Sequence, residues 1–98
     1  MNIQKMLQQA QKVQARLQEE MERLEVEASA GGGMVTARMN GKKQLLSLAV
    51  QPKAVDPNDV EMLQDLVLAA VNEAARKVDE ALEARMGSLG LPGLPGLT

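Results

Sequence analysis

Apolar residues recur every three or four positions over the first 27 residues of the chain. The series comprises Ile3, Met6, Leu7, Ala10, Val13, Leu17, Met21 and Leu24. This spacing places them on one face of an α-helix, so we predict an amphipathic helix from Asn2 to about Glu27. Four members of the series are seven residues apart, which permits a coiled-coil-like seam, although Glu20 interrupts it.

Between Val35 and Val50 the apolar residues instead alternate with polar ones, which is the period of a half-buried strand. Asn40 and Gly41 separate two such runs, and both residues tolerate the positive φ of a tight turn, so we predict a β-hairpin. Its apolar residues share one face whether the loop has two or four residues. They are Val35, Ala37, Met39, Leu46, Leu48 and Val50. A short extended segment, Val26 to Ala30, precedes the hairpin.

The glycines of the stretch GGGMVTARMNGKK do not form a phosphate-binding motif. A Walker loop would need glycine at Thr36 and a hydroxyl at Lys43, and a dinucleotide fingerprint beginning at Gly31 would also need glycine at Thr36. We interpret Gly31 to Gly33 as a mobile connection into the hairpin.

A second helix is predicted to begin at Asp56-Pro57, where Asp56 suits the N-cap and Pro57 the first helical position. Its apolar face is continuous to about Met86, with Gly87 as the C-cap. Ala70 and Ala74 on that face allow another backbone to approach closely. The remaining sequence, GSLGLPGLPGLT, has glycine every third residue in too few triplets for a collagen helix. We predict one folded domain over residues 1–87 and a disordered tail over 88–98.

The composition restricts the chemistry of the protein. The 98 residues include no Phe, Tyr, Trp, Cys or His. The chain therefore lacks a thiolate, an imidazole, a phenol, a nitrogen or sulfur ligand for zinc, and an aromatic platform for stacking bases. We predict a protein that is not an enzyme, with no catalytic residues, cofactor, metal site or small-molecule substrate. The polar N-terminus and the lack of a membrane-length apolar run favour a cytoplasmic location.

Charge is unevenly distributed along the chain, although the net charge is only −2. At about 100° per residue, four cations of the first predicted helix lie within roughly 20° of one line and more than 100° from its apolar stripe. They are Lys5, Lys12, Arg16 and Arg23. Arg16 and Arg23 have acids within four residues, Glu20 and Glu19, which would make this face an ordinary solvated one. Lys5 and Lys12 have no acid at that spacing.

Three further segments give the sequence a specific resemblance. QKMLQQAQKVQ near the start, the spacing G-x-V-x-x-x-x-N-G from Gly33 to Gly41, and DLVLAAVNEAARKV from Asp65 to Val78 resemble the bacterial YbaB/EbfC family of nucleoid-associated proteins. The resemblance extends over residues 1 to about 87. It implies an α+β fold with an α-β-β-β-α protomer, an antiparallel three-stranded sheet and two long helices. It also implies a tweezer-like homodimer that binds double-stranded DNA with little sequence preference in the nucleoid, affecting nucleoid organisation and gene expression.

The same resemblance implies that the two projecting helices contact DNA. On this chain the corresponding cations are Lys5, Lys12, Arg16 and Arg23 on the first helix and Arg76, Lys77 and Arg85 on the second. The second set lies among acids, which weakens it as a site for an anion. The apolar hairpin residues with Ala70 and Ala74 are expected to form the core and the dimer interface. An alternative function is a protein–protein adaptor or small chaperone that clamps another helix and does not bind nucleic acid.

Overall fold

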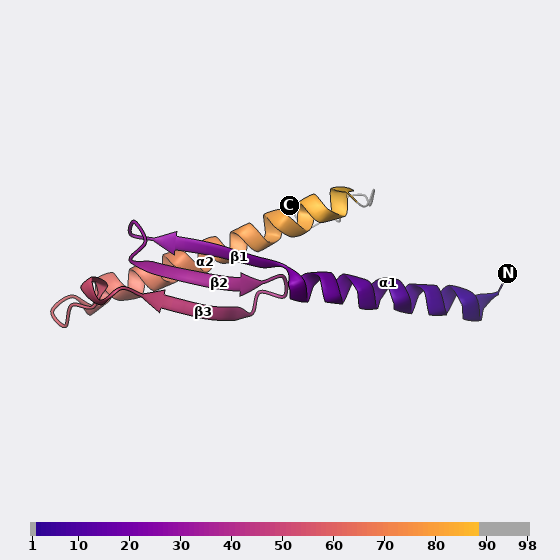
Figure 1. The fold of residues 1–98 in the computed structure, drawn as a ribbon, viewed down its shortest axis with the longest axis horizontal. Helices are drawn as coiled ribbons and strands as arrows, with labels where there is room; N and C mark the ends of the chain where they lie inside the picture. Colours follow the sequence, from indigo (N-terminus) through magenta and orange to yellow (C-terminus); the bar gives the residue numbers. More distant parts are fainter. Residues whose placement is uncertain (1, 89–98) are drawn as a thin grey trace.

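The computed structural model describes residues 2–88 of the chain, so most of the tail predicted to be disordered, residues 89–98, lies outside the described residues. The elements follow the predicted α-β-β-β-α order (Figure 1), which confirms the α+β class. They are α1 (Ile3–Arg23), β1 (Glu25–Ala30), β2 (Val35–Asn40), β3 (Leu45–Val50), a 3-10 turn η1 (Pro52–Ala54) and α2 (Val60–Ser88).

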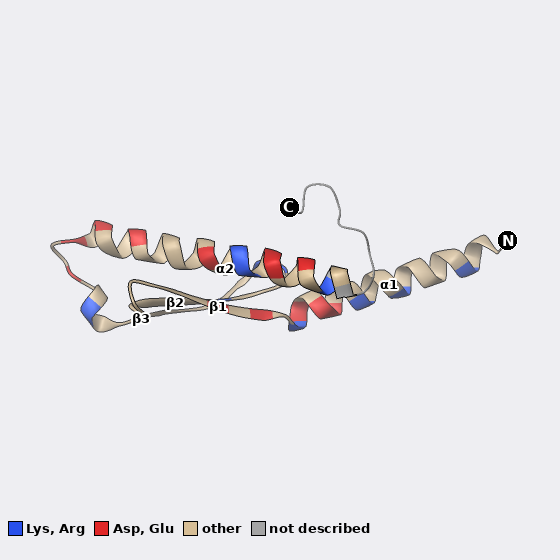
Figure 2. Cartoon of the chain, turned by 90° about the horizontal axis from the view of Figure 1, so that it is seen from above, with Lys and Arg blue, Asp and Glu red and all other residues tan. Residues whose placement is uncertain are grey.

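The three strands form one antiparallel sheet in the order β1-β2-β3, and α2 packs on one face of β1 and β2. Figure 2 shows this arrangement with the sheet seen edge-on. The core lies between them and is formed by Ala28, Val35, Ala37, Met39, Ala70, Ala74 and Val78. Alanine occupies core positions on β1, β2 and α2, so small side chains let the helix approach the sheet closely. β3 is outside the cover of α2, and every one of its residues is exposed.

The hairpin loop between β2 and β3 has the longer of the two predicted lengths, and its positive φ is not at Asn40 or Gly41. The connection is four residues long, and the positive φ (61°) belongs to Lys43. The buried Asn40 shapes the loop through its side-chain oxygen, which accepts from the backbone N–H groups of Lys42 and Gln44. The β2–β3 register shifts between Arg38 and Met39, so Leu45 is opposite Met39 and the prediction that Leu46 shares the face of Met39 is wrong.

Gly41 is required in this hairpin because α1 lies directly against it. The Gly41 N–H donates to the carbonyl oxygens of Met21 (2.8 Å) and Leu24 (3.1 Å). A Cβ on Gly41 would lie 2.5 Å from the Met21 oxygen, a distance that no side chain tolerates. Gly41 therefore attaches the last turn of α1 to the hairpin.

Gly31 to Gly33 form a turn between β1 and β2, in the place where they were predicted to connect into the hairpin. All three have positive φ, at 64°, 68° and 94°, a backbone region that is costly for residues with a Cβ. The turn joins two antiparallel strands and does not precede a helix, so it lacks the geometry of a phosphate-binding loop.

Both helices differ from prediction at their ends. α1 stops at Arg23, and Leu24, placed by periodicity on the helix, is buried just beyond it. Asp56 to Asp59 form a turn, and α2 begins at Val60, with the Asp59 carboxylate accepting from the Met62 N–H. α2 also continues through Gly87, because glycine can adopt helical angles as well as left-handed ones. Within residues 2–88, neither helix is both long and apolar enough to cross a membrane.

Candidate nucleic-acid interface

α1 projects from the rest of the molecule as an arm. The protein measures 68 × 21 × 17 Å, and α1 extends along the longest direction, past the end of α2 (Figures 1 and 2). No residue of α1 is buried. The body holds this helix through its last turn, where Gly41 donates to Met21 and Lys42 Nζ lies 2.8 Å from Glu22 Oε1.

The four cations predicted on the first helix lie along one side of this arm. Over residues 2–88, Lys5, Lys12, Arg16 and Arg23 have neither an ion pair nor a side-chain hydrogen bond. At 1.5 Å per residue, the line from Lys5 to Arg23 is about 27 Å long. The arm therefore presents a row of four charges to solvent, which we call the cationic ridge.

Two local ion pairs that would have neutralised this ridge do not form. Glu20, the sequence neighbour expected for Arg16, instead accepts from Arg85 Nη1 of α2 at 3.1 Å. Arg23 likewise does not pair with Glu19 among the residues that the structure describes. Because Glu20 pairs with Arg85 of α2, its carboxylate does not neutralise Arg16 on the cationic ridge.

The three candidate cations of α2 are engaged within the protomer. Arg76 contacts both Glu73 and Glu80, and the hydrogen bonds that its guanidinium donates to these two carboxylates raise its pKa. The bond from Arg76 also lowers the pKa of Glu73. Lys77 Nζ donates to the carbonyl oxygen of Glu27 on β1 at 2.8 Å, and Arg85 is paired with Glu20. These three side chains support the fold, and their charges are offset locally.

The cations around the hairpin are paired as well. Arg38 contacts Glu25 across the polar face of the sheet, and Lys43 Nζ lies 2.8 Å from Asp79 Oδ1 of α2. Lys42 donates a hydrogen bond to the Glu22 carboxylate and thereby lowers the pKa of Glu22. Lys53 on η1 has no ion pair within residues 2–88, but η1 follows β3 at the end of the sheet opposite the hairpin loop and α1. The cations without acidic partners are therefore concentrated on α1.

The structure separates the residues expected in the core and dimer interface into two groups. Val35, Ala37, Met39, Ala70 and Ala74 are buried between sheet and helix. Leu46, Leu48 and Val50 are exposed, at 46%, 40% and 36%. Leu48 and Val50 pair with Ala37 and Val35, so they lie on the helix side of the sheet.

An apolar groove on α2 adjoins this exposed strand face, and sequence reasoning missed it. The groove is lined by Leu63, Gln64, Val67, Leu68 and Val71. Val71 and Gln64 lie about 120–140° around α2 from Lys77, and Lys77 reaches β1. The groove therefore faces the β3 side of the protomer. Periodicity placed Leu63, Val67 and Val71 on the apolar face of α2, but periodicity does not indicate which part of such a face stays uncovered.

These features define a small α+β protein with an exposed cationic helix and an uncovered strand edge. The fold is similar to that of a crystal structure of an uncharacterized protein from Helicobacter pylori, with a TM-score of 0.74 over 91% of this chain and 97% of that chain, at 23% identity. A nucleoid-associated protein of Acetivibrio thermocellus is 52% identical over 98% of this chain and 89% of its own length. Another, from Koribacter versatilis, is 50% identical over 94% of this chain and 95% of its own.

The model of the YbaB/EbfC DNA-binding family matches residues 1–94. The chain belongs to this family, as the resemblance of its motifs indicated. It is a family of nucleoid-associated DNA-binding proteins and not a family of enzymes.

Proposed function

We propose that the protein is a homodimer that binds duplex DNA through phosphate contacts from the cationic ridge of α1, with little sequence preference. It would act in the nucleoid, on nucleoid organisation and gene expression. The observation that carries this proposal is the difference between the two helices. Lys5, Lys12, Arg16 and Arg23 have no acidic partner within residues 2–88, whereas Arg76, Lys77 and Arg85 are engaged.

Phosphate contacts are favoured by the type and the placement of these side chains. Lysine and arginine on one line about 27 Å long can follow a DNA backbone, which carries one charge per ~1.7 Å of duplex axis. Contacts of this kind position a protein on DNA without reading its sequence. The absence of aromatic residues removes base stacking as a source of affinity for single strands. These properties favour duplex DNA as the ligand.

Dimerisation is supported by the state of β3 in the protomer. A six-residue strand of sequence LLSLAV, without a charge or a proline, lies at the edge of the sheet with its outer N–H and C=O groups unpaired. Such an edge readily pairs with another chain. Leu48 and Val50 lie on the same side of the sheet as α2, and the groove on α2 faces β3. A second copy of the chain can therefore cover the strand edge and the groove together. We infer that two protomers join their sheets at β3, which brings two cationic ridges into one particle.

The proposal is tested by the salt dependence of DNA affinity. If the dimer neutralises four to six phosphates, the logarithm of the affinity falls against the logarithm of salt concentration with a slope of about −3.6 to −5.4. The variant Lys5→Gln/Lys12→Gln/Arg16→Gln should bind all duplex sequences more weakly, to about the same extent, and should show a flatter slope. Glutamine is a good helix former, so the helicity of α1 should be retained. Gel-shift titrations on random duplexes at several salt concentrations measure both quantities.

The matched control removes the same number of positive charges elsewhere. In Arg38→Gln/Arg76→Gln/Lys77→Gln the three residues are ones engaged within the protomer. This variant should keep the wild-type salt slope and lose less affinity than the α1 variant. Melting temperatures of both variants establish that they are folded. Wild-type affinity in the α1 variant together with lost affinity in the control would place the DNA site at Arg38, Arg76 or Lys77 and not on α1.

A further inference from the structure

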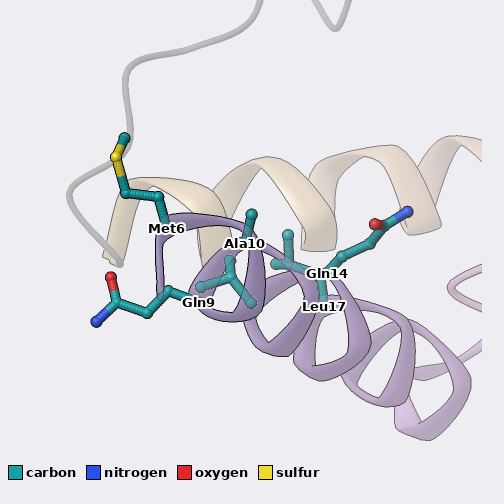
Figure 3. Close-up of a pocket in the computed structure, with 6 residues that line it drawn as sticks. Met6, Gln9, Ala10, Gln14 and Leu17 are labelled. Carbon is teal, nitrogen blue, oxygen red and sulfur yellow. The ribbon is translucent and has the colours of Figure 1, made fainter. Parts of the chain in front are cut away.

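A shallow apolar groove runs along α1 and borders the cationic ridge. Its lining residues are Met6, Gln9, Ala10, Val13, Gln14 and Leu17 (Figure 3). Gln9 lies about 20° around the helix from Arg16, so one edge of the groove is next to the ridge. Val13 is 57% exposed and Met6 is 56% exposed. An amphipathic helix normally packs its apolar face against another element, and no element within residues 2–88 covers this one.

The residues of the groove are arranged so that it matches itself in the reverse direction. Residues equally far from its midpoint have similar side chains, and they form three pairs. The pairs are Met6 with Leu17, Gln9 with Gln14, and Ala10 with Val13. A contact about a two-fold axis requires this property, because each residue then meets the other member of its pair on the second copy. The four apolar residues follow each other at spacings of four, three and four, the pattern of a coiled-coil seam.

Charge favours an antiparallel pair of arms over a parallel one. Glu20 is seven residues beyond Val13 and has the same seam position, so parallel arms would place the two copies of Glu20 against each other. In an antiparallel pair, Glu20 is level with Ile3 of the second copy, at the end of the seam, and can keep its ion pair with Arg85. Arg16 flanks the seam beside Gln9 of the second copy, which is uncharged.

We propose that the α1 arms of two copies of the chain pair antiparallel, groove against groove, with Met6 of each arm against Leu17 of the other. Lys5 and Lys12 lie about 110–130° around α1 from the middle of the groove, so both stay exposed on the outside of the pair.

The groove lies where α1 extends past the sheet and is separate from β3 (Figure 1). One copy can therefore use its arm with one neighbour and its strand edge with another, and two such self-complementary surfaces join dimers into a row. A row of dimers would place successive cationic ridges along one duplex. This consequence rests on the proposed function, whereas the contact between arms does not.

The first experiment uses the lack of cysteine in the chain, which makes single cysteines clean reporters of contact. Full-length Met6→Cys and Leu17→Cys proteins are mixed under mild oxidation without DNA. A disulfide needs Cα atoms within about 7 Å, a condition that the antiparallel pair meets between the two variants. Met6 residues of paired arms are about 17 Å apart along the axis. The mixed disulfide should therefore form about tenfold faster than the disulfide of Met6→Cys with itself.

The matched control mixes Gln8→Cys with Ala15→Cys. These two residues are also level with each other in the antiparallel pair, but they are exposed about 140–160° around α1 from Val13. Their disulfide should form only at the rate of random collision. The Met6→Cys and Leu17→Cys mixture should still cross-link when both proteins carry Leu48→Asp, because the arm contact does not use β3. Failure of the β3 dimer and failure of the arm contact are thus distinguishable.

The second experiment makes one substitution at two positions of α1 and measures DNA binding. Ala10 lines the groove, and Ala15 is exposed about 140° around the helix from it. In the wild type, affinity per dimer should be about fivefold or more higher for a long duplex than for one that holds a single dimer. Ala10→Gln should abolish this difference, and Ala15→Gln should keep it. Neither substitution changes a charge, so affinity for the short duplex should stay at the wild-type value.

Three results would overturn the proposal. Cross-linking in the groove mixture could be no faster than in the control mixture. Met6→Cys could form a disulfide with itself as fast as with Leu17→Cys, which would show that the arms are not antiparallel. Cross-linking could disappear with Leu48→Asp, which would show that arms meet only within the β3 dimer. Equal effects of Ala10→Gln and Ala15→Gln on the long duplex would refute the row of dimers on DNA.

Discussion

At the residue scale, the glycines of this chain serve different purposes that the sequence alone does not separate. Gly31 to Gly33 provide positive φ for the turn between β1 and β2. Gly41 does not have a positive φ and is needed because the backbone of Met21 occupies the space of a side chain. The first group shapes a turn through its own conformation, whereas Gly41 determines where α1 is attached.

We therefore expect Gly41→Ala and Gly32→Ala to act differently. A Cβ added at position 41 would collide with backbone atoms, so the variant should lose roughly 1–3 kcal/mol or more of unfolding free energy and exchange amide hydrogens faster around Met21 and Leu24. Gly32 has open space around it, so an alanine there should cost about 1–2 kcal/mol through its left-handed conformation alone. Denaturant unfolding and hydrogen exchange measure both effects. Equal exchange at the end of α1 in both variants would contradict the role assigned to Gly41.

At the scale of elements, α1 is an arm fixed at one end. The contacts that hold that end include the hydrogen bond from Gly41 to Met21, the ion pair of Lys42 with Glu22, and the ion pair of Arg85 with Glu20. The two ion pairs connect α1 to different elements, the hairpin loop and α2. The rest of the arm, with its cationic ridge, extends beyond them.

The ion pair of Lys42 with Glu22 should make this attachment sensitive to acid. Lys42 lowers the pKa of Glu22 in the folded protein below the ordinary value of 4.5. The stabilisation is therefore complete above about pH 4.5 and is lost as the pH falls through the lower folded value. A carbon-13 NMR titration of the Glu22 carboxyl should show a midpoint below 4.5 that rises toward the ordinary value in Lys42→Met.

The matched control for that titration is Lys53→Met, which removes a lysine that has no ion pair within residues 2–88. It should leave the midpoint of Glu22 unchanged. A wild-type midpoint at 4.5, the ordinary value, would show that the ion pair does not persist in solution.

At the scale of the whole molecule, the protomer leaves one apolar surface incomplete. β3 and the groove on α2, at the border of the core, are left uncovered by the described residues, and a sheet edge of this composition is a ready site for pairing. We expect Leu48→Asp to shift the protein from dimer to monomer in sedimentation at micromolar concentration. Because Leu48 is already 40% exposed in the protomer, the fold itself should be retained.

The control for Leu48→Asp is Ser47→Asp on the same strand. Ser47 is opposite Arg38 in the β2–β3 register, on the polar face of the sheet. An aspartate there should leave the dimer intact. A wild-type protein that remains a compact monomer at micromolar concentration would refute the proposed dimer and the doubling of the cationic ridge.

The sequence by itself determined the type and order of the elements and the helix face of α1 on which the cations lie. Hydrophobic periodicity and turn residues are local properties, and the phase of a helix fixes which side chains share a face. For that reason the amphipathic first helix, the hairpin and the line from Lys5 to Arg23 were all predicted. The exact ends of the helices were not predicted. Leu24 fits the apolar period of α1 although it lies beyond the helix, and Asp56 suits an N-cap as well as Asp59 does.

Only the tertiary structure decided which cations are paired within the protomer. Arg85 pairs with Glu20 across 65 residues, Lys77 bonds to Glu27 across 50, and Lys43 reaches Asp79 on α2. Such contacts form when α2 docks on the sheet and α1 on the hairpin, so local spacing does not predict them. The expected pair of Arg16 with Glu20 failed for the same reason, because Arg85 occupies that carboxylate. The lack of acidic partners for the cations on the arm is therefore a consequence of tertiary packing.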